Sequence, residues 1–185
     1  MSGMKIKDSI FEEEKEEFPW DENALKSFKN LLKDQRITCL MDDIFLLGFL
    51  RATEYDLPSS LQLLKNYYNT RVNYPQYIKN LLPSKMEEVL NMNILQFLPK
   101  PDQNGSYIYF FRFGNWDTSV ANGIDVVRVI LLILDLQLNL HRTQEKKITC
   151  IVDGEGLSLS HFYNYTPRIM NTFAAIALVN SVFYC

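Results

Sequence analysis

The segment 126–140, VVRVILLILDLQLNL, constrains the fold most, because it is too apolar to lie on the surface of a globular protein. Its second half alternates apolar and polar residues, which is typical of a half-buried strand. On a helical wheel, however, the polar residues form one narrow stripe, and Gln137 alone lies opposite. That stripe comprises Asp125, Arg128, Asp135 and Asn139. Leucine favours helix and the segment exceeds the usual strand length, so we predict a helix of about 16 residues or more.

Such a helix has two broad apolar flanks, and each must be covered to keep it out of water. One flank can pack on a β-sheet. The other needs a second cover, which can be another helix or a hydrophobic ligand. The periodicity does not separate these two, and an ordinary protein core is the simpler interpretation.

Composition excludes several classes of protein. The chain has 185 residues, of which 47% are hydrophobic and 22% charged, as in a globular protein of one domain or two small ones. A net charge of −3 gives no general basic field and argues against a nucleic-acid partner. No apolar run reaches the length of about 18 residues that spans a membrane. Three isolated cysteines without a secretory signal indicate a cytoplasmic protein.

The first half of the chain predicts helices. Residues 1–18 are acidic and expected to be loose, and residues 19–91 are expected to form a helical module. Three helices are predicted, at 22–34, at 44–52 and from residue 57 onward, with Pro75 and Pro83 punctuating two shorter pieces. Each longer helix follows an aspartate that can cap it: Asp21, Asp42 or Asp43, and Asp56.

The second half predicts an α/β arrangement. Strands are expected within 93–99, 107–113 and 146–153, with the long apolar helix between the second and the third. A last helix is expected from Thr166 to about residue 179. Because strands and helices alternate after an all-helical start, the fold class is α/β preceded by a helical bundle.

Few residues suggest chemistry. Asp153, Glu155 and His161 lie near the end of the third strand, but two carboxylates and one histidine are a weak signal for a metal or an acid–base site. We expect the carboxylates to cap the loop and the following short helix. His141 is expected to contact the terminal carbonyls of the long helix. We expect Trp116 to pack in the interior, Asp117 to cap the next segment and Cys150 to be a small core residue.

Four stretches in order carry a resemblance to the CRAL-TRIO (Sec14-like) lipid-binding family, and within it to the tocopherol-carrier branch. They are DDIFLLGFLRATEYDLPSSLQLLKNYY, FRFGNWD, TQEKKITCIVDGEGLSLSH and TPRIMNTFAAI. The resemblance implies a helical module at 19–91 and a partial lipid-binding domain at 92–185. It implies non-catalytic binding and transfer of a hydrophobic ligand, such as a tocopherol, a retinoid or a phospholipid. No cofactor and no metal are implied, and exchange would occur at a transient membrane surface.

The resemblance also implies which side chains line an apolar pocket, so that the second flank of the long helix would border the ligand. In tocopherol carriers two of these positions, Ile130 and Leu134, are serines, so a hydroxyl-bearing head group would find fewer partners here. Alternation puts Ile148, Cys150 and Val152 on one face of the third strand. The implied pocket-wall residues are Phe111, Val127, Ile130, Leu134, Ile148, Val152, Tyr165, Phe173 and Ile176.

The sequence departs from the family in two ways. The family's domain continues with another strand and a mobile gate helix, whereas this sequence ends at Cys185, so we expect a partial, C-terminally truncated domain. The alternative is a truncated isoform that acts as a protein-interaction module without lipid transfer. Relatives carry arginines at the positions of Gly48 and Thr53, while Arg51 is kept. Most of a phosphoinositide-binding basic patch is therefore missing.

Overall fold

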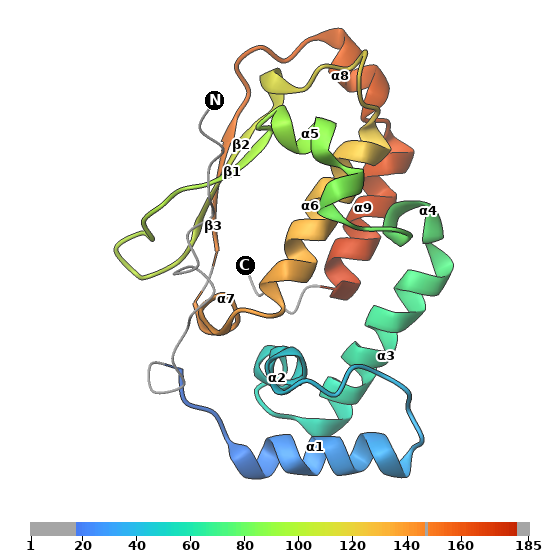
Figure 1. Cartoon of the computed structure of the whole chain (residues 1–185), viewed down its shortest axis with the longest axis vertical. Helices are drawn as coiled ribbons and strands as arrows, with labels where there is room; N and C mark the ends of the chain where they lie inside the picture. The colour runs from blue at the N-terminus through green and yellow to red at the C-terminus, as the bar shows by residue number, and fades with distance from the viewer. Residues whose placement is uncertain (1–17, 147, 181–185) are drawn as a thin grey trace.

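The structure is a computed structural model that describes residues 18–146 and 148–180 (Figure 1). A helical part at the N-terminal end packs against helices of a second part, which holds a three-stranded sheet and the long apolar helix. The predicted fold class, α/β after a helical bundle, is confirmed. Residues 1–17 lie outside the described part, so the expectation of a loose N-terminus is tested only at Phe18, which is buried.

The first three helices are α1 (Glu22–Asp34), α2 (Asp43–Ala52) and α3 (Leu57–Asn73). All three begin at the predicted aspartates, whose side chains accept hydrogen bonds from backbone N–H groups of the first turn. Asp42, rather than Asp43, caps α2. Hydrogen bonds from Ser59 hold the pKa of the Asp56 carboxyl below its ordinary value. Capping decides these helix starts because it satisfies otherwise unpaired N–H groups.

One apolar cluster joins these three helices. The predicted face of α1, made by Leu25, Phe28 and Leu32, is buried against α2 and α3. Phe45, Phe49 and Tyr67 meet edge to face within it. Leu138, from beyond the end of the long helix, also enters this cluster, so the helical part and the α/β part share a core.

Three short helices follow: α4 (Pro75–Ile78), the 3₁₀ turn η2 (Pro83–Lys85) and α5 (Glu87–Asn91). The two prolines start two of these pieces, as predicted. Their buried residues, Tyr77, Met86 and Val89, pack with the α/β part and not with α1–α3. The predicted domain boundary at residue 91 thus marks the change from helix to strand and not the change in packing. It stays a proposal.

The sheet contains β1 (Leu95–Phe97), β2 (Ile108–Arg112) and β3 (Thr149–Asp153) in that spatial order. β1 pairs antiparallel with β2, and β2 pairs parallel with β3. Asp102 closes the β1–β2 turn by accepting hydrogen bonds from the N–H groups of Asn104 and Ser106. Thr149 at the start of β3 donates to the same carboxylate, which fixes the turn beside the third strand.

The long apolar segment is the helix α6 (Gly123–Gln137), as predicted, and Asn122 caps it in a capping box with Asp125. Its first flank, with Val126, Val129 and Ile133, packs in the cluster that contains the sheet. The helix α9 (Pro167–Asn180) lies beside α6 (Figure 1), and together with α4 it covers the second flank. Another helix, rather than a ligand, is therefore the main cover of that flank.

Two arginines tie the helical part to the α/β part. Arg51 of α2 reaches the short helix α7 (His141–Glu145), where its guanidinium donates to the Gln144 side chain at 2.6 Å. Arg71 of α3 pairs with Asp135 of α6 and lies 3.4 Å above the ring of Tyr67. Burial and the Asp135 charge raise the pKa of the Tyr67 phenol. The junction therefore combines shared apolar packing with half-buried charge pairs.

Candidate functional site

The face of the sheet that looks toward the helices is only partly covered. In a parallel pair, residues at the same register position point to the same side. Tyr109 and Phe111 of β2 pack against α6, and their register partners on β3 are Cys150 and Val152. Tyr109 is 3% exposed, yet Cys150 is exposed and Val152 is 63% exposed. The helices therefore cover β2 and leave the same face of β3 open.

This arrangement corrects one expectation from the sequence. Cys150 was expected to be a small core residue, but it lies exposed on β3. The alternation predicted correctly that it shares a face with Val152. It did not predict the exposure, because strand periodicity identifies a common side and not what covers that side. We call Ile148, Cys150 and Val152 the open floor.

Half-buried side chains border the open floor. Leu134 of α6, Phe173 of α9 and Tyr165 each belong to the cluster under the sheet and to the cluster between α6 and α9. Burial raises the pKa of the Tyr165 hydroxyl, with a contribution from Tyr77. The border is therefore apolar and carries a single phenolic hydroxyl, which suits a hydrophobic molecule better than a charged one.

The nine residues predicted to line a pocket fall into three groups. Val127, Ile130 and Ile176 are buried in contact with other side chains of the protein. Phe111, Leu134, Ile148, Tyr165 and Phe173 are half-buried, and Val152 is exposed. The structure thus brings Phe111, Leu134, Ile148, Val152, Tyr165 and Phe173 to the open floor and its border. Their role in ligand binding stays a prediction.

Sequence reasoning missed a second apolar surface. The short helix α8 (Leu159–Asn164) exposes Leu159, Phe162 and Tyr163, and Met170 of α9 is also exposed. The signal was present in the stretch LSLSHFY, where Leu159, Phe162 and Tyr163 stand at the helical spacing i, i+3 and i+4. Exposed large apolar residues in one region mark an interaction surface more often than a free surface.

The Asp-Gly-Glu-Gly loop after β3 has a structural role. Asp153 accepts a hydrogen bond from the Glu155 N–H at 2.9 Å and pairs with Arg112 of β2. A Cβ on Gly114 would lie 2.0 Å from the Glu155 carbonyl oxygen, so two backbones meet here. The expectation that Asp153 shapes the loop is confirmed. Ser158, however, caps α8, whereas the sequence assigned that role to the carboxylates.

His161 is held by backbone groups and by its own helix. Its Nδ1 accepts from the Ser158 N–H at 3.0 Å, and its Nε2 lies 3.0 Å from the Trp116 carbonyl oxygen. Trp116 is buried, as expected, and donates its indole N–H to the Ala121 carbonyl. Asp117 accepts from Ser119, which lowers the pKa of the Asp117 carboxyl. These contacts make this region a packed corner of the domain.

Arg51 and His141 depart from their expected surroundings. The Arg51 side chain is 4% exposed, and its Nε lies 2.7 Å from the Glu145 carboxylate in an ion pair without an aligned hydrogen bond. His141 contacts Arg51, with 3.0 Å between the guanidinium nitrogen and Nδ1, whereas helix-terminal carbonyls were expected. The carbonyls of Gln137 and Leu140 instead accept from the hydroxyl of Thr143. The guanidinium of Arg51 is therefore engaged by side chains of the protein itself.

Two absences hold for the described residues. No group of three or more histidine, cysteine, aspartate or glutamate side chains lies close enough there to hold a metal ion. None of the helices in residues 18–146 and 148–180 is both long and apolar enough to cross a bilayer.

A helical module followed by a β2–α6–β3 unit is consistent with a partial Sec14-like α/β domain. The sequence comparison agrees: residues 91–180 match the CRAL/TRIO domain, so this part of the chain is a CRAL/TRIO domain. Domains of this family bind lipids and other small hydrophobic molecules and are generally non-enzymatic.

The relatives found are of two kinds. The chain is 31% identical over 160 residues to proteins named "Alpha-tocopherol transfer protein-like" from Mus musculus and Homo sapiens. That match covers 85% of this chain and 47% of each relative. It is 28% identical over 131 residues to "Clavesin-1" of Xenopus laevis, covering 70% of this chain and 40% of the relative. The chain thus spans about half, or less than half, of the length of the curated relatives that it matches.

Proposed function

We propose that this protein binds a small hydrophobic molecule or lipid, non-covalently and without catalysis, on the open floor of β3. The observation that supports this most is the 63% exposure of Val152 on the face of the sheet that looks toward the helices. A ligand chain lying over β3 would contact Val152 and Ile148 below and the Leu134–Phe173 border beside it. The ligand would complete the layer that α6 provides over β2.

The driving force would be the removal of apolar surface from water. At about 25 cal/mol per Å², burying about 200 Å² of ligand and protein surface contributes about 5 kcal/mol. Few polar groups lie at the site, so hydrogen bonding would add little. We propose pickup and release at a membrane surface and a cytoplasmic location, within a helical module at 19–91 and a partial lipid-binding domain at 92–185.

The ligand class follows from the border of the site. The name of the tocopherol-type relatives connects them with α-tocopherol, and a tocopherol, a retinoid or a phospholipid chain would all suit an apolar floor. Leu134 supplies no hydroxyl, and Ile130 is 8% exposed within the core, so neither position offers a polar partner to a head group. We therefore favour a ligand recognised mainly through its apolar part.

The test compares two valine substitutions on the whole chain. Val152→Asp places a carboxylate on the open floor, whereas Val72→Asp places one on α3, where Val72 is 77% exposed. We expect Val152→Asp to lower the affinity for a fluorescent tocopherol or retinoid at least tenfold, since a carboxylate must stay hydrated. Val72→Asp should bind like the wild type. Equal binding by both variants, or no lipid in an organic extract analysed by mass spectrometry, would contradict the proposal.

The exposed residues of α8 support one alternative from a different class. Leu159, Phe162 and Tyr163 are 74%, 66% and 78% exposed, and they fit a protein-interaction module that carries no lipid. Under this alternative, Leu159→Ser with Phe162→Ser would abolish partner capture, and organic extraction would yield no bound lipid. Under the carrier proposal, the same double variant would keep its affinity for the fluorescent ligand.

A further inference from the structure

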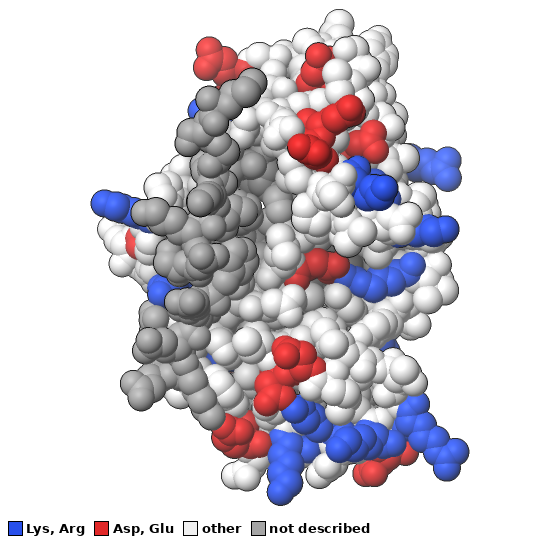
Figure 2. Space-filling view, viewed as in Figure 1, with Lys and Arg blue, Asp and Glu red and all other residues white. Residues whose placement is uncertain are grey.

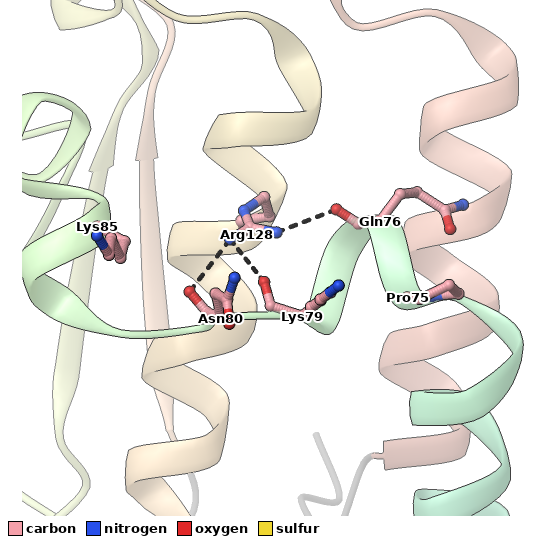
Figure 3. A pocket seen from close by; sticks show the side chains of 6 residues that line it. All are labelled: Pro75, Gln76, Lys79, Asn80, Lys85 and Arg128. Atoms are coloured by element: carbon pink, nitrogen blue, oxygen red, sulfur yellow. Dashed lines mark hydrogen bonds between the residues drawn. The ribbon is translucent and has the colours of Figure 1, made fainter.

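A hollow of about 440 Å³ lies between α4, η2 and α6, away from the open floor. Its lining residues are Pro75, Gln76, Lys79, Asn80, Lys85 and Arg128. Three of these six side chains are cationic and none is a carboxylate. Figure 3 shows Arg128 in the middle, with Lys85 on one side and Lys79 on the other. In Figure 2, blue side chains project from the right-hand edge of the molecule, where Figure 1 places α4.

Arg128 fixes the base of the hollow. Its guanidinium donates to the backbone carbonyls of Gln76 at 3.1 Å, Lys79 at 2.9 Å and Asn80 at 3.3 Å. Asn80 adopts a left-handed conformation with φ of 55°, which turns the chain after α4. A guanidinium carries five N–H donors. Three hydrogen bonds, which use three of these five donors, therefore hold Arg128 in place.

The two lysines are available to a ligand. Both are exposed, and neither forms an ion pair or a side-chain hydrogen bond with any described residue. Glu87 and Glu88 follow Lys85 closely in the sequence, but they do not line the hollow. Unpaired ammonium groups at the rim of a concave surface, with a guanidinium fixed at its base, attract small anions.

We propose that this hollow is a binding site for a phosphate-bearing anion, either free in solution or as the head group of a membrane lipid. Lys79 and Lys85 would pair with the phosphate oxygens, and the fixed charge of Arg128 would attract them. The site differs from Arg51, whose charge is enclosed between α2 and α7. It does not depend on the proposed hydrophobic ligand, because the two surfaces share no residue.

The test uses the whole chain with two matched double variants. Lys79→Ala with Lys85→Ala removes the two free ammonium groups of the hollow. Lys26→Ala with Lys33→Ala removes two exposed lysines of α1 and changes the net charge equally. Binding is measured to vesicles of phosphatidylcholine and phosphatidic acid at about 9:1, with phosphatidylcholine alone for comparison. Inorganic phosphate is titrated separately while the backbone amide NMR signals of residues 76–82, 84 and 85 are followed.

Each lysine should contribute about fivefold to the affinity for anionic vesicles, so the hollow variant should bind about 25-fold more weakly. The α1 variant should bind within about twofold of the wild type. Vesicle binding that depends on phosphatidic acid and on both lysines identifies a lipid head group. Saturable amide shifts with inorganic phosphate, without such vesicle binding, identify a free anion. Equal losses in the two double variants, or no response to either probe, would overturn the proposal.

Discussion

Replacing Arg51 tests how the helical part is held to the α/β part. The guanidinium of Arg51 donates to Gln144 Oε1 at 2.6 Å and to the Phe18 carbonyl at 3.2 Å. A hydrogen bond that involves a charged group contributes about 1.5–3 kcal/mol, so these two contribute about 3–6 kcal/mol. The ion pair adds little, because the Glu145 side chain is 38% exposed and well hydrated.

We therefore expect Arg51→Ala to lower the free energy of unfolding by about 3–6 kcal/mol, a large part of the 5–15 kcal/mol typical of a domain. For a chain of this size the Tm should fall by roughly 6–24 °C. Arg51→Lys should recover only part of the loss, because an ammonium lacks the planar fork that reaches two acceptors. Urea unfolding followed by circular dichroism measures both variants. Arg168→Ala, at an exposed position of α9, is the control.

If Arg51→Ala loses less than about 1 kcal/mol, and so resembles an ordinary surface substitution, the junction does not depend on this arginine. The hydrogen bonds from Arg51 to Gln144 and Phe18 would then contribute no net stability. Shared apolar packing through Leu138 would be the remaining connection between the two parts.

Three further outcomes are expected. Burial and the Arg51 charge hold the pKa of His141 below its unfolded value of about 6.5, against a smaller opposing effect of Asp42. The free energy of unfolding should therefore have its full value above about pH 6.5 and fall as the pH drops through the folded pKa. In His141→Gln the urea midpoint should depend less on pH over this range. Gln137 is 1% exposed and its side-chain amide has no hydrogen-bond partner among the described residues. Gln137→Met should therefore raise the free energy of unfolding, measured in urea, by about 1–3 kcal/mol. A lower free energy of unfolding in this variant would show that the amide is hydrogen bonded. Gly114→Ala should lower the free energy of unfolding by about 1–3 kcal/mol in the same assay. Gly154→Ala should lower it less, because a Cβ there would lie 3.6 Å from Leu157 Cδ1.

Much of the local structure was predictable because its causes lie within a few residues. Asp21, Asp42 and Asp56 each cap a helix through N–H groups two or three positions later, so their pattern is visible in the sequence. The helix over the long apolar segment was predictable for the same reason, since side chains three and four apart share a face. The family resemblance rested on the order of four stretches along the chain.

The candidate site was predictable only in part. Alternation placed Ile148, Cys150 and Val152 on one side of a strand, but no local pattern indicates that α6 covers β2 and leaves β3 open. The environment of His141 was predicted wrongly, because its partner Arg51 lies 90 positions earlier in the chain. The hollow beside α4 was not predicted at all, since it depends on Arg128 meeting carbonyls about 50 positions away.

By itself, the sequence determined where helices begin, which residues share a face, and that one helix is too apolar for a single cover. Only the tertiary structure decided that α9 and α4 supply the second cover and that exposed apolar surfaces lie on β3 and α8. The physical reason is the range of the interactions. Capping and periodicity act within one or two turns, whereas burial and charge pairing depend on which distant elements come into contact.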